Sequence, residues 1–315
     1  MARWYPPLMV RFIAAAVSLA SVGAFVACSA TQDGGSFGDG GSGGSGAGSG
    51  AGTNQGAGPS FDGGLGGGGA AGPGCSEEAK LVYVVGQANE LYSFYPPDLA
   101  FKQVGVINCP TGGFSQPFSM AVARNGTAYV LFTDGNIFAV DTKTAACQAT
   151  GFVPNQAGLS TYGKAFVSNT SGSEDETLYV ADYAGTGIAK IDTATMTLSF
   201  VGAYDTLTGS AELTGTGDAR LFGFFLSTPV KVAEIDKTNG HILSQAPQPT
   251  VNIGSAWAFA FWGGDFYLFT NPTSTTSQVD RYRPSDGTTV TLQQNVGLSI
   301  VGAGVSTCAP ITPPN

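Results

Sequence analysis

The sequence predicts an all-β fold, a five-bladed β-propeller that is closed by its own C-terminal strand. Three observations predict it. A strand followed by a polar turn recurs five times, at spacings of 44 to 51 residues. The region that begins at residue 75 starts with a second strand and ends with a surplus first strand. Cysteines stand beside both of these unmatched strands.

The N-terminal residues 1–27 predict a bacterial lipoprotein signal peptide. Arg3 and Arg11 supply positive charge, and residues 12–27 form an apolar run of 16 residues, which is short for a membrane span. The run ends in "FVAC", which resembles a lipobox. This resemblance implies cleavage before Cys28 and diacylation of its thiol, so we expect lipidation at Cys28. An ordinary secretory signal with a chance cysteine is the alternative.

Residues 28–74 predict a disordered, lipid-anchored linker. Of the 46 positions from 29 to 74, 21 are glycine, and none is lysine or arginine. Such a segment cannot bury enough apolar surface to offset the entropy of ordering it. A chain of this length and composition has an r.m.s. reach of roughly 35–40 Å. We expect it to tether the folded domain, residues 75–315, to the membrane.

The composition of residues 75–315 excludes nucleic-acid binding. Its 241 residues are enough for one sizeable core. Of the 13 basic and 22 acidic residues of the chain, 11 and 19 lie here, which makes the net charge −8. Phosphate recognition needs basic patches, and this region has the opposite charge. We expect a monomer without a cofactor.

The repeated element is the third strand of each blade with the turn after it. The last apolar residues of these strands are separated by 46, 51, 44 and 47 residues. They are Phe94, Val140, Ile191, Ile235 and Tyr282. A period of 40 to 50 residues with several short strands per unit indicates a propeller blade.

The other strands are predicted from runs rich in Val, Ile, Phe, Tyr and Thr between turn residues. The predicted first strands are 118–123, 164–169, 211–215, 257–262 and 298–305. The second strands are 81–86, 127–132, 177–182, 220–225 and 265–270. The fourth strands are 101–107, 146–152, 197–203, 241–246 and 289–294.

The surplus strand 298–305 is expected to fill the vacant first place beside 81–86, which leaves no unpaired inner edge. A Cys75–Cys308 disulfide then replaces the turn between these strands and contributes about 2–5 kcal/mol. Four cysteines in an exported domain indicate two disulfides, so Cys109 pairs with Cys147 by elimination. A six-bladed ring with further strands in the longer loops is the alternative.

One face of the propeller is the expected ligand face. It carries the loops that enter first strands and those that join second to third strands. These loops are rich in Thr, Ser, Asn, Gln and Gly, and they contain the aromatic residues Phe114, Tyr162, Tyr183 and Tyr204. Aromatic rings among hydroxyls and amides suit glycan or peptide recognition. Ordinary solvated turns, with the aromatic residues packed between blades, are the alternative.

The candidate ligand-binding residues are predicted near the ends of first strands. Ser119, Lys164, Glu212 and Trp257 stand at first-strand starts; Lys164 and Glu212 would face the channel mouth, which Trp257 could plug. Asp218 lies in the polar loop before 220–225. The predicted set is Lys164, Tyr183, Glu212, Asp218 and Trp257. An ordinary ion pair, a core tryptophan and a surface turn are the alternative interpretation.

Catalytic chemistry has few candidate residues. The single histidine, His241, is predicted to be exposed at a turn, and no G-x-S-x-G surrounds a serine of residues 75–315. One histidine and no C-x-x-C leave a zinc site without ligands. We predict no catalytic residue, no metal site and no enzyme. A lactonase-type hydrolase with a metal at the channel mouth, held by acids such as Glu212 and Asp218, is the alternative.

The segments "AELTGTGDARLFGF", "WAFAFWGGDF" and "VGAGVSTCAP", with "FVAC" and the Gly-rich linker, resemble uncharacterised myxobacterial lipoproteins that have a propeller-like C-terminal domain. The resemblance implies a lipid-anchored envelope protein and no particular activity. Ser29 after Cys28 favours the outer membrane. We expect a membrane-tethered, non-catalytic binding or scaffold module with a glycan or protein ligand at the loop face.

Overall fold

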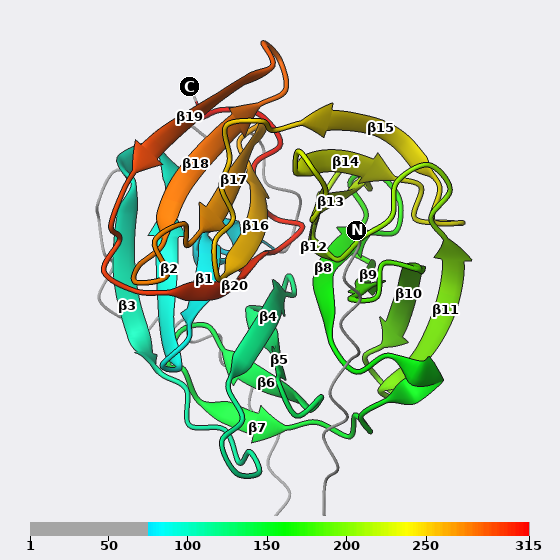
Figure 1. Ribbon diagram of the computed structural model, residues 1–315. Helices are drawn as coiled ribbons and strands as arrows, with labels where there is room; N and C mark the ends of the chain where they lie inside the picture. The colour runs from blue at the N-terminus through cyan, green and yellow to red at the C-terminus, as the bar shows by residue number, and fades with distance from the viewer. Residues whose placement is uncertain (1–74, 315) are drawn as a thin grey trace, which may run out of the picture. The chain divides into compact units, whose positions relative to one another are not determined.

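The computed structural model describes residues 75–314, which form five antiparallel four-stranded sheets around a central axis (Figure 1). This is the five-bladed β-propeller that the strand period predicts. The signal peptide, the lipidation site at Cys28 and the linker lie outside the described residues. Within residues 75–314, no helix is long and apolar enough to cross a membrane.

The strands of each blade are given from the channel outward. Blade 1 consists of β20 (Ile300–Val305), β1 (Val82–Gly86), β2 (Glu90–Tyr95) and β3 (Ala100–Val106). Blade 2 consists of β4 (Pro117–Val122), β5 (Thr127–Phe132), β6 (Ile137–Asp141) and β7 (Cys147–Ala149). Blade 3 consists of β8 (Tyr162–Ser168), β9 (Glu176–Asp182), β10 (Gly187–Asp192) and β11 (Thr197–Ala203). Blade 4 consists of β12 (Ala211–Gly215), β13 (Leu221–Phe225), β14 (Lys231–Ile235) and β15 (Ile242–Pro247). Blade 5 consists of β16 (Trp257–Trp262), β17 (Asp265–Thr270), β18 (Gln278–Arg283) and β19 (Thr288–Gln293). Three short 3-10 helices, η1 (Glu78–Lys80), η2 (Pro96–Asp98) and η3 (Gln156–Gly158), lie between strands.

The C-terminal strand closes the ring as predicted. β20 pairs antiparallel with β1, with Val305 opposite Val82 and Gly302 opposite Val85. The Cys75–Cys308 disulfide joins the chain on either side of this pair, across 233 residues of sequence. It occupies the place of the turn that connects first and second strands in the other blades.

The second disulfide, Cys109–Cys147, links the connection after β3 to the outer strand of blade 2 and confirms the pairing by elimination. β7 is shorter than the predicted strand 146–152. The hydroxyl of Thr150 donates to the carbonyl of Ile137 at 2.6 Å. This side chain therefore bonds to β6 beyond the last backbone pair of β6 and β7, which is Phe138 with Ala149.

In blades 2, 3 and 4, the turn after the third strand is built around an aspartate side chain. Asp141 Oδ1 accepts from the backbone N–H of Lys143 at 2.8 Å and of Thr144 at 2.9 Å. Asp192 and Asp236 make equivalent bonds. These bonds make the polar turn a local structure, which explains why a similar short phrase recurs along the chain.

The core lies between neighbouring blades. Where blade 1 meets blade 5, the ring of Phe94 packs edge-on against Tyr267 and Phe269, at centroid distances of 5.9 and 5.5 Å. Similar apolar clusters fill the other junctions between blades. Because the second strands are buried on both faces, each blade holds its first strand firmly against the channel.

The central channel is narrow because its inner strands approach each other closely. A Cβ on Gly163 of β8 would lie 2.2 Å from the carbonyl oxygen of Ala211, and one on Gly215 would lie 2.1 Å from that of Phe166. Glycine is therefore required at both ends of the β8–β12 contact. The channel is filled by side chains rather than open from face to face.

Candidate functional site

Three polar residues from three different blades meet inside the channel. Lys164 Nζ of β8 donates to the backbone carbonyl of Ser119 in β4 at 2.8 Å. The Ser119 hydroxyl donates to Glu212 Oε2 of β12 at 2.9 Å. The three residues are between 0% and 3% exposed. Ser119 thus connects the buried ammonium to the buried carboxyl, and we call these three residues the polar relay.

Burial dominates the electrostatics of the polar relay. It lowers the pKa of Lys164 to about 7, although the charge of Glu212 acts in the opposite direction. It raises the pKa of Glu212 to about 8, opposed by the charge of Lys164 and the hydrogen bond from Ser119. The low-dielectric channel therefore favours the neutral form of both side chains.

A cavity of about 110 Å³ lies at one end of the channel, and we call it the mouth cavity. Its walls come from the first residues of inner strands in blades 1, 2, 4 and 5 and from the loop before β16. They are Pro117, Phe118, Glu212, Ser255, Ala256, Trp257 and Val301. Glu212 is therefore shared between the mouth cavity and the polar relay.

Aromatic rings from three blades meet at this end of the channel. Tyr183, in the turn between β9 and β10, stacks on Trp257 with a centroid distance of 6.3 Å and an interplanar angle of 30°. Its edge also faces Phe118 at 5.7 Å. Tyr183 remains 43% exposed. It links blade 3 to blades 2 and 5 while presenting part of its ring to solvent.

The two tryptophans of β16 differ in their hydrogen bonding. Trp262, at the far end of the strand, donates from Nε1 to the carbonyl of Lys80 at 2.7 Å. Trp257 Nε1 is buried and has no partner among residues 75–314. A buried donor without a partner costs about 1–3 kcal/mol, and such groups in native proteins often have a functional reason.

Three of the five predicted ligand residues come together. Glu212 and Trp257 line the mouth cavity, and Tyr183 stacks on Trp257. Lys164 lies deeper and reaches Glu212 through Ser119. Asp218 lies in the turn at the opposite end of β12, where it accepts a hydrogen bond from the Thr216 hydroxyl.

The alternative function, a hydrolase with a metal at the channel mouth, was assigned to acids such as Glu212 and Asp218. The two acids stand at opposite ends of β12 and do not face a common point. Within residues 75–314, no three His, Cys, Asp or Glu side chains are grouped so that they could hold a metal ion.

The loop aromatic residues differ from the prediction in two places. Tyr162 is the first residue of β8 rather than part of the preceding loop, and it is fully buried. Tyr204 is 8% exposed and packs edge-on against Phe225. Burial raises the pKa of both tyrosines. Phe114 and Tyr183 are exposed, as a ligand face requires.

The sequence did not single out Phe118, Ser255 or Val301 as parts of the site. A bulge between Pro117 and Ser119 sets the register of β4, so residues 118 and 119 both contribute to the channel end. Phe118 faces Tyr183 while Ser119 enters the polar relay. A bulge of this kind leaves no distinct pattern in the sequence.

The other end of the channel is closed by polar contacts with the C-terminal segment. The Thr307 hydroxyl donates to Glu176 Oε2 at 2.9 Å, and Arg124 Nη1 donates to Thr307 Oγ1 at 3.2 Å. The backbone N–H of Arg124 donates to Glu176 Oε1 at 2.8 Å. The disulfide Cys75–Cys308 lies beside these contacts, so the mouth cavity is on the face opposite to the two ends of the described segment 75–314.

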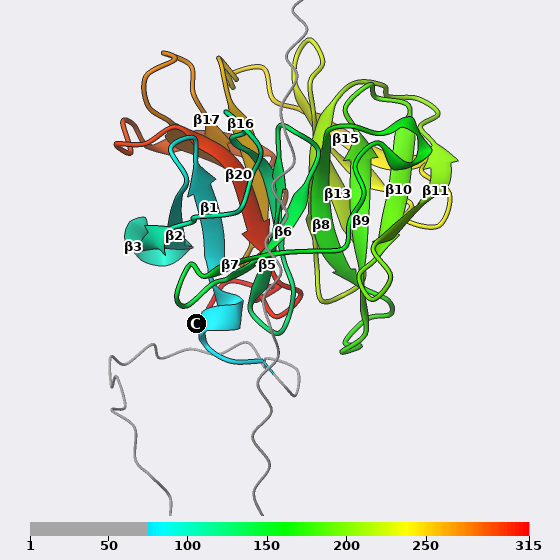
Figure 2. The ribbon, with the colours of Figure 1, turned by 90° about the horizontal axis from the view of Figure 1, so that it is seen from below.

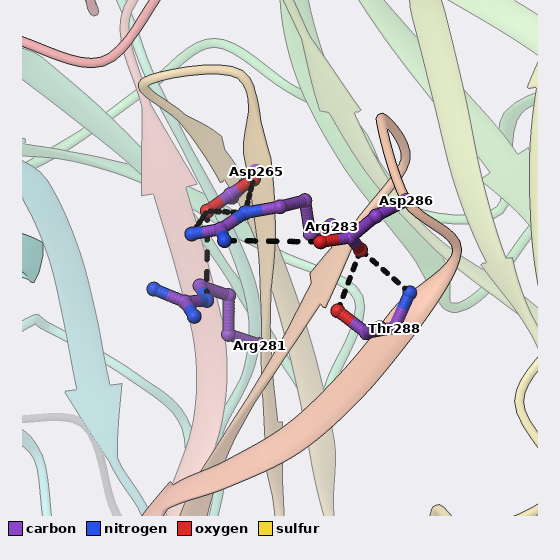
Figure 3. Close-up of polar contacts among 5 residues, drawn as sticks. All are labelled: Asp265, Arg281, Arg283, Asp286 and Thr288. Atoms are coloured by element: carbon purple, nitrogen blue, oxygen red, sulfur yellow. Dashed lines mark hydrogen bonds and ion pairs between the residues drawn. The ribbon is translucent and has the colours of Figure 1, made fainter.

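A second charged cluster lies on blade 5, away from the mouth cavity (Figure 3). Asp265, which is 8% exposed, pairs with Arg281 at 3.5 Å and Arg283 at 3.3 Å. Asp286 accepts from both the backbone and the hydroxyl of Thr288. The ion pairs of Asp265 with Arg281 and Arg283 connect β17 to β18. His241 is exposed in the turn before β15, as predicted, with Asp205 Oδ2 4.0 Å from its Nδ1.

Comparisons with known proteins find no matching family model and no matching curated protein. A chain in a nidogen–laminin complex is similar in structure, with 10% identity, a TM-score of 0.47, and coverage of 71% of this chain and 97% of that one. A protein of unknown function from Bacteroides caccae has 14% identity and a TM-score of 0.41, over 70% of this chain and 84% of its own. Another from Bacteroides thetaiotaomicron has 14% identity and a TM-score of 0.43, over 62% and 55%. At these identities the similarity does not extend to function.

Proposed function

We propose that this protein is a non-catalytic binding module of the cell envelope, with a glycan or protein ligand at the mouth cavity. The observation that carries the proposal is the meeting of Trp257, Tyr183 and Glu212 at one end of the channel. Aromatic rings give contact area, and a few polar groups give orientation, which is the usual composition of a ligand site. The rings are held by three rigid blades, so the site is formed before the ligand arrives.

The arrangement of ionisable groups favours binding over catalysis. Glu212 is the single ionisable side chain among the residues that line the mouth cavity. General acid–base chemistry needs a group within hydrogen-bond reach of the substrate and commonly a second group to complete the cycle. Lys164 and the hydroxyl of Ser119 are fully buried beneath Glu212 and already hydrogen-bonded.

We place the protein in the envelope, tethered by a lipid on Cys28 and by the Gly-rich segment 28–74. Two disulfides fit an oxidising compartment outside the cytoplasm. The described chain starts at Cys75, on the face opposite to the mouth cavity; Figure 2 shows η1 and the C-terminal end on one side of the propeller. A tether that enters there does not obstruct the mouth cavity.

The proposal is tested by co-sedimentation of the full chain with isolated envelope material. We expect binding by the wild type and at least tenfold weaker binding by the Tyr183→Ala/Trp257→Phe variant. The matched control is Phe200→Ala/Trp262→Phe, which removes an exposed ring from β11 and the other tryptophan of β16. Equal binding by all three proteins would overturn the site.

Two further measurements address the tether and the absence of catalysis. A clickable fatty acid should label the wild type and not Cys28→Ala, and equal labelling of both would end the lipoprotein assignment. A panel of ester, lactone and glycoside substrates should show no turnover. Turnover that Glu212→Gln abolishes would replace the binding proposal with a hydrolase.

A further inference from the structure

Two residues that line the mouth cavity each carry a polar atom that the described part of the chain does not match. Trp257 lines the cavity, and its buried Nε1 has no partner in the described part of the chain. Glu212 also lines the cavity; its Oε2 accepts from Ser119, whereas its Oε1 takes no hydrogen bond from residues 75–314. A ligand group that satisfies both must accept from the indole and pair with the carboxyl.

The walls around these two polar groups are apolar or aromatic. Pro117, Ala256 and Val301 contribute aliphatic surface, and Trp257 and Phe118 contribute rings. Tyr183 backs the Trp257 ring by stacking on it. A flat aromatic wall with polar groups at its edge suits a ligand that has an apolar face and polar substituents around its rim.

The hydrogen-bond requirement distinguishes among ligand charges. An ammonium group would be attracted by the rings and by Glu212, but it has no lone pair to accept from Trp257 Nε1. An anion would accept from the indole and from the protonated carboxyl of Glu212, but the ionised carboxylate would repel it. A hydroxyl both accepts and donates, so it can satisfy the two groups together.

We infer that the mouth cavity binds a neutral, hydroxyl-bearing sugar ring at the end of a glycan. This inference rests on the proposed function and names the class of its ligand. The ring stacks its C–H face on Trp257, while its hydroxyls pair with the indole N–H and with the carboxyl of Glu212.

The size of the cavity agrees with a single terminal group. Its volume of about 110 Å³ is room for several water molecules and not for a folded peptide or an oligosaccharide chain. The rest of the glycan lies outside, over the exposed part of Tyr183 and toward Phe114, which is on the same face and fully exposed.

A hydroxyl also suits both protonation states of Glu212. Burial raises the pKa of this carboxyl to about 8, so protonated and ionised forms are both present near neutral pH. A hydroxyl donates to the carboxylate and accepts from the carboxylic acid. The interaction therefore persists in either form, whereas a charged partner would favour only one.

The test is isothermal titration of the full chain in a detergent without a sugar head group. The neutral probes are the methyl glycosides of glucose, galactose, mannose and N-acetylglucosamine. The charged probes are glucosamine, glucuronate and choline, and N-acetylserine amide represents a protein hydroxyl. We expect at least one neutral glycoside to bind at least tenfold more tightly than every charged probe and the serine amide.

Two tryptophan variants locate the binding and control for folding. Trp257→Phe keeps a ring but removes the unpaired N–H, and it should weaken the best glycoside at least tenfold without lowering the thermal midpoint. Trp262→Phe removes the indole that donates to Lys80, and it should lower the thermal midpoint while leaving glycoside affinity within twofold. Unchanged affinity in Trp257→Phe would overturn the inference.

The failure of the inference and the failure of the proposed function give different results. Tighter binding of choline, glucosamine or the serine amide, lost in Trp257→Phe, overturns the neutral sugar ring as the ligand and leaves the binding module in place. The same conclusion follows if binding of the envelope material requires Trp257 but no neutral glycoside competes with that material. If neither the probes nor the envelope material depend on Trp257 and Tyr183, both are wrong.

Discussion

The hydroxyl of Ser119 donates to Glu212 across the propeller channel at 2.9 Å, although the two residues are 93 positions apart. The bond joins the first strands of blades 2 and 4, which are not neighbours in the ring. Lys164 of blade 3 completes the connection through the Ser119 carbonyl. The polar relay therefore ties three blades together directly beneath the mouth cavity.

Removing both ionisable side chains of the polar relay should cost less free energy of unfolding than the two single removals added together. Lys164→Met leaves the buried carbonyl of Ser119 without its donor, which costs about 1–3 kcal/mol, and it also withdraws the charge that favours ionised Glu212. The double variant Lys164→Met/Glu212→Gln has no unpaired charge, so it should lose less free energy of unfolding than the sum of the single variants. Urea unfolding of the four proteins measures this coupling. Additive losses would mean that the two side chains do not interact.

The polar relay should also produce a minimum in stability near neutral pH. The folded pKa of Glu212 is raised from 4.5 to about 8, so its contribution falls as the pH rises through this range. That of Lys164 is lowered from 10.5 to about 7, so its contribution rises from about pH 7 upward. The free energy of unfolding of the wild type, relative to Lys164→Met/Glu212→Gln, should fall to pH 7, be lowest between pH 7 and 8, and then rise. A pH-independent difference would contradict the shifted pKa values.

The ring-closing disulfide should contribute more stability than the other one. Cys75–Cys308 spans 233 residues and Cys109–Cys147 spans 38, and the chain-entropy relation makes the difference about 1.6 kcal/mol. We expect the Cys75→Ala/Cys308→Ala variant to be less stable than Cys109→Ala/Cys147→Ala by this margin in denaturant unfolding. A larger loss from opening Cys109–Cys147 would show that local strain or packing outweighs loop length.

The two tryptophans of β16 should respond oppositely to replacement by phenylalanine in the ligand-free protein. Trp262→Phe leaves the Lys80 carbonyl without its donor and should lower the free energy of unfolding by about 1–3 kcal/mol. Trp257→Phe removes a buried donor that has no partner, so it should leave the free energy of unfolding unchanged or raise it. Thermal unfolding of both variants decides this, and equal losses would indicate that Trp257 Nε1 is satisfied.

The strand order and closure were predictable because they depend on patterns that recur along the chain. Aspartates such as Asp141 and Asp192 build the same local turn in different blades, and that turn sets the visible period. The surplus strand beside Cys308 had only one vacant place to fill.

The site was less predictable because it depends on which residues meet across the channel. Glu212, Trp257 and Tyr183 were identified from their places at strand starts and in a face loop. The connection through Ser119 and the ring contact of Phe118 depend on the bulge in β4. Asp218 was grouped with Glu212 as an acid of the channel mouth, but β12 carries them to opposite ends of the channel.

Hydroxyl-radical footprinting with mass spectrometry tests the location of the binding site most directly, since it needs no substitution. The full chain is oxidised with and without isolated envelope material, and the modification of each exposed ring is quantified. Binding at the mouth cavity should protect Tyr183 and Trp257, while Phe200 on the outer strand β11 keeps its rate. Protection of Phe200 with no change at Tyr183 and Trp257 would contradict a ligand site at the mouth of the channel.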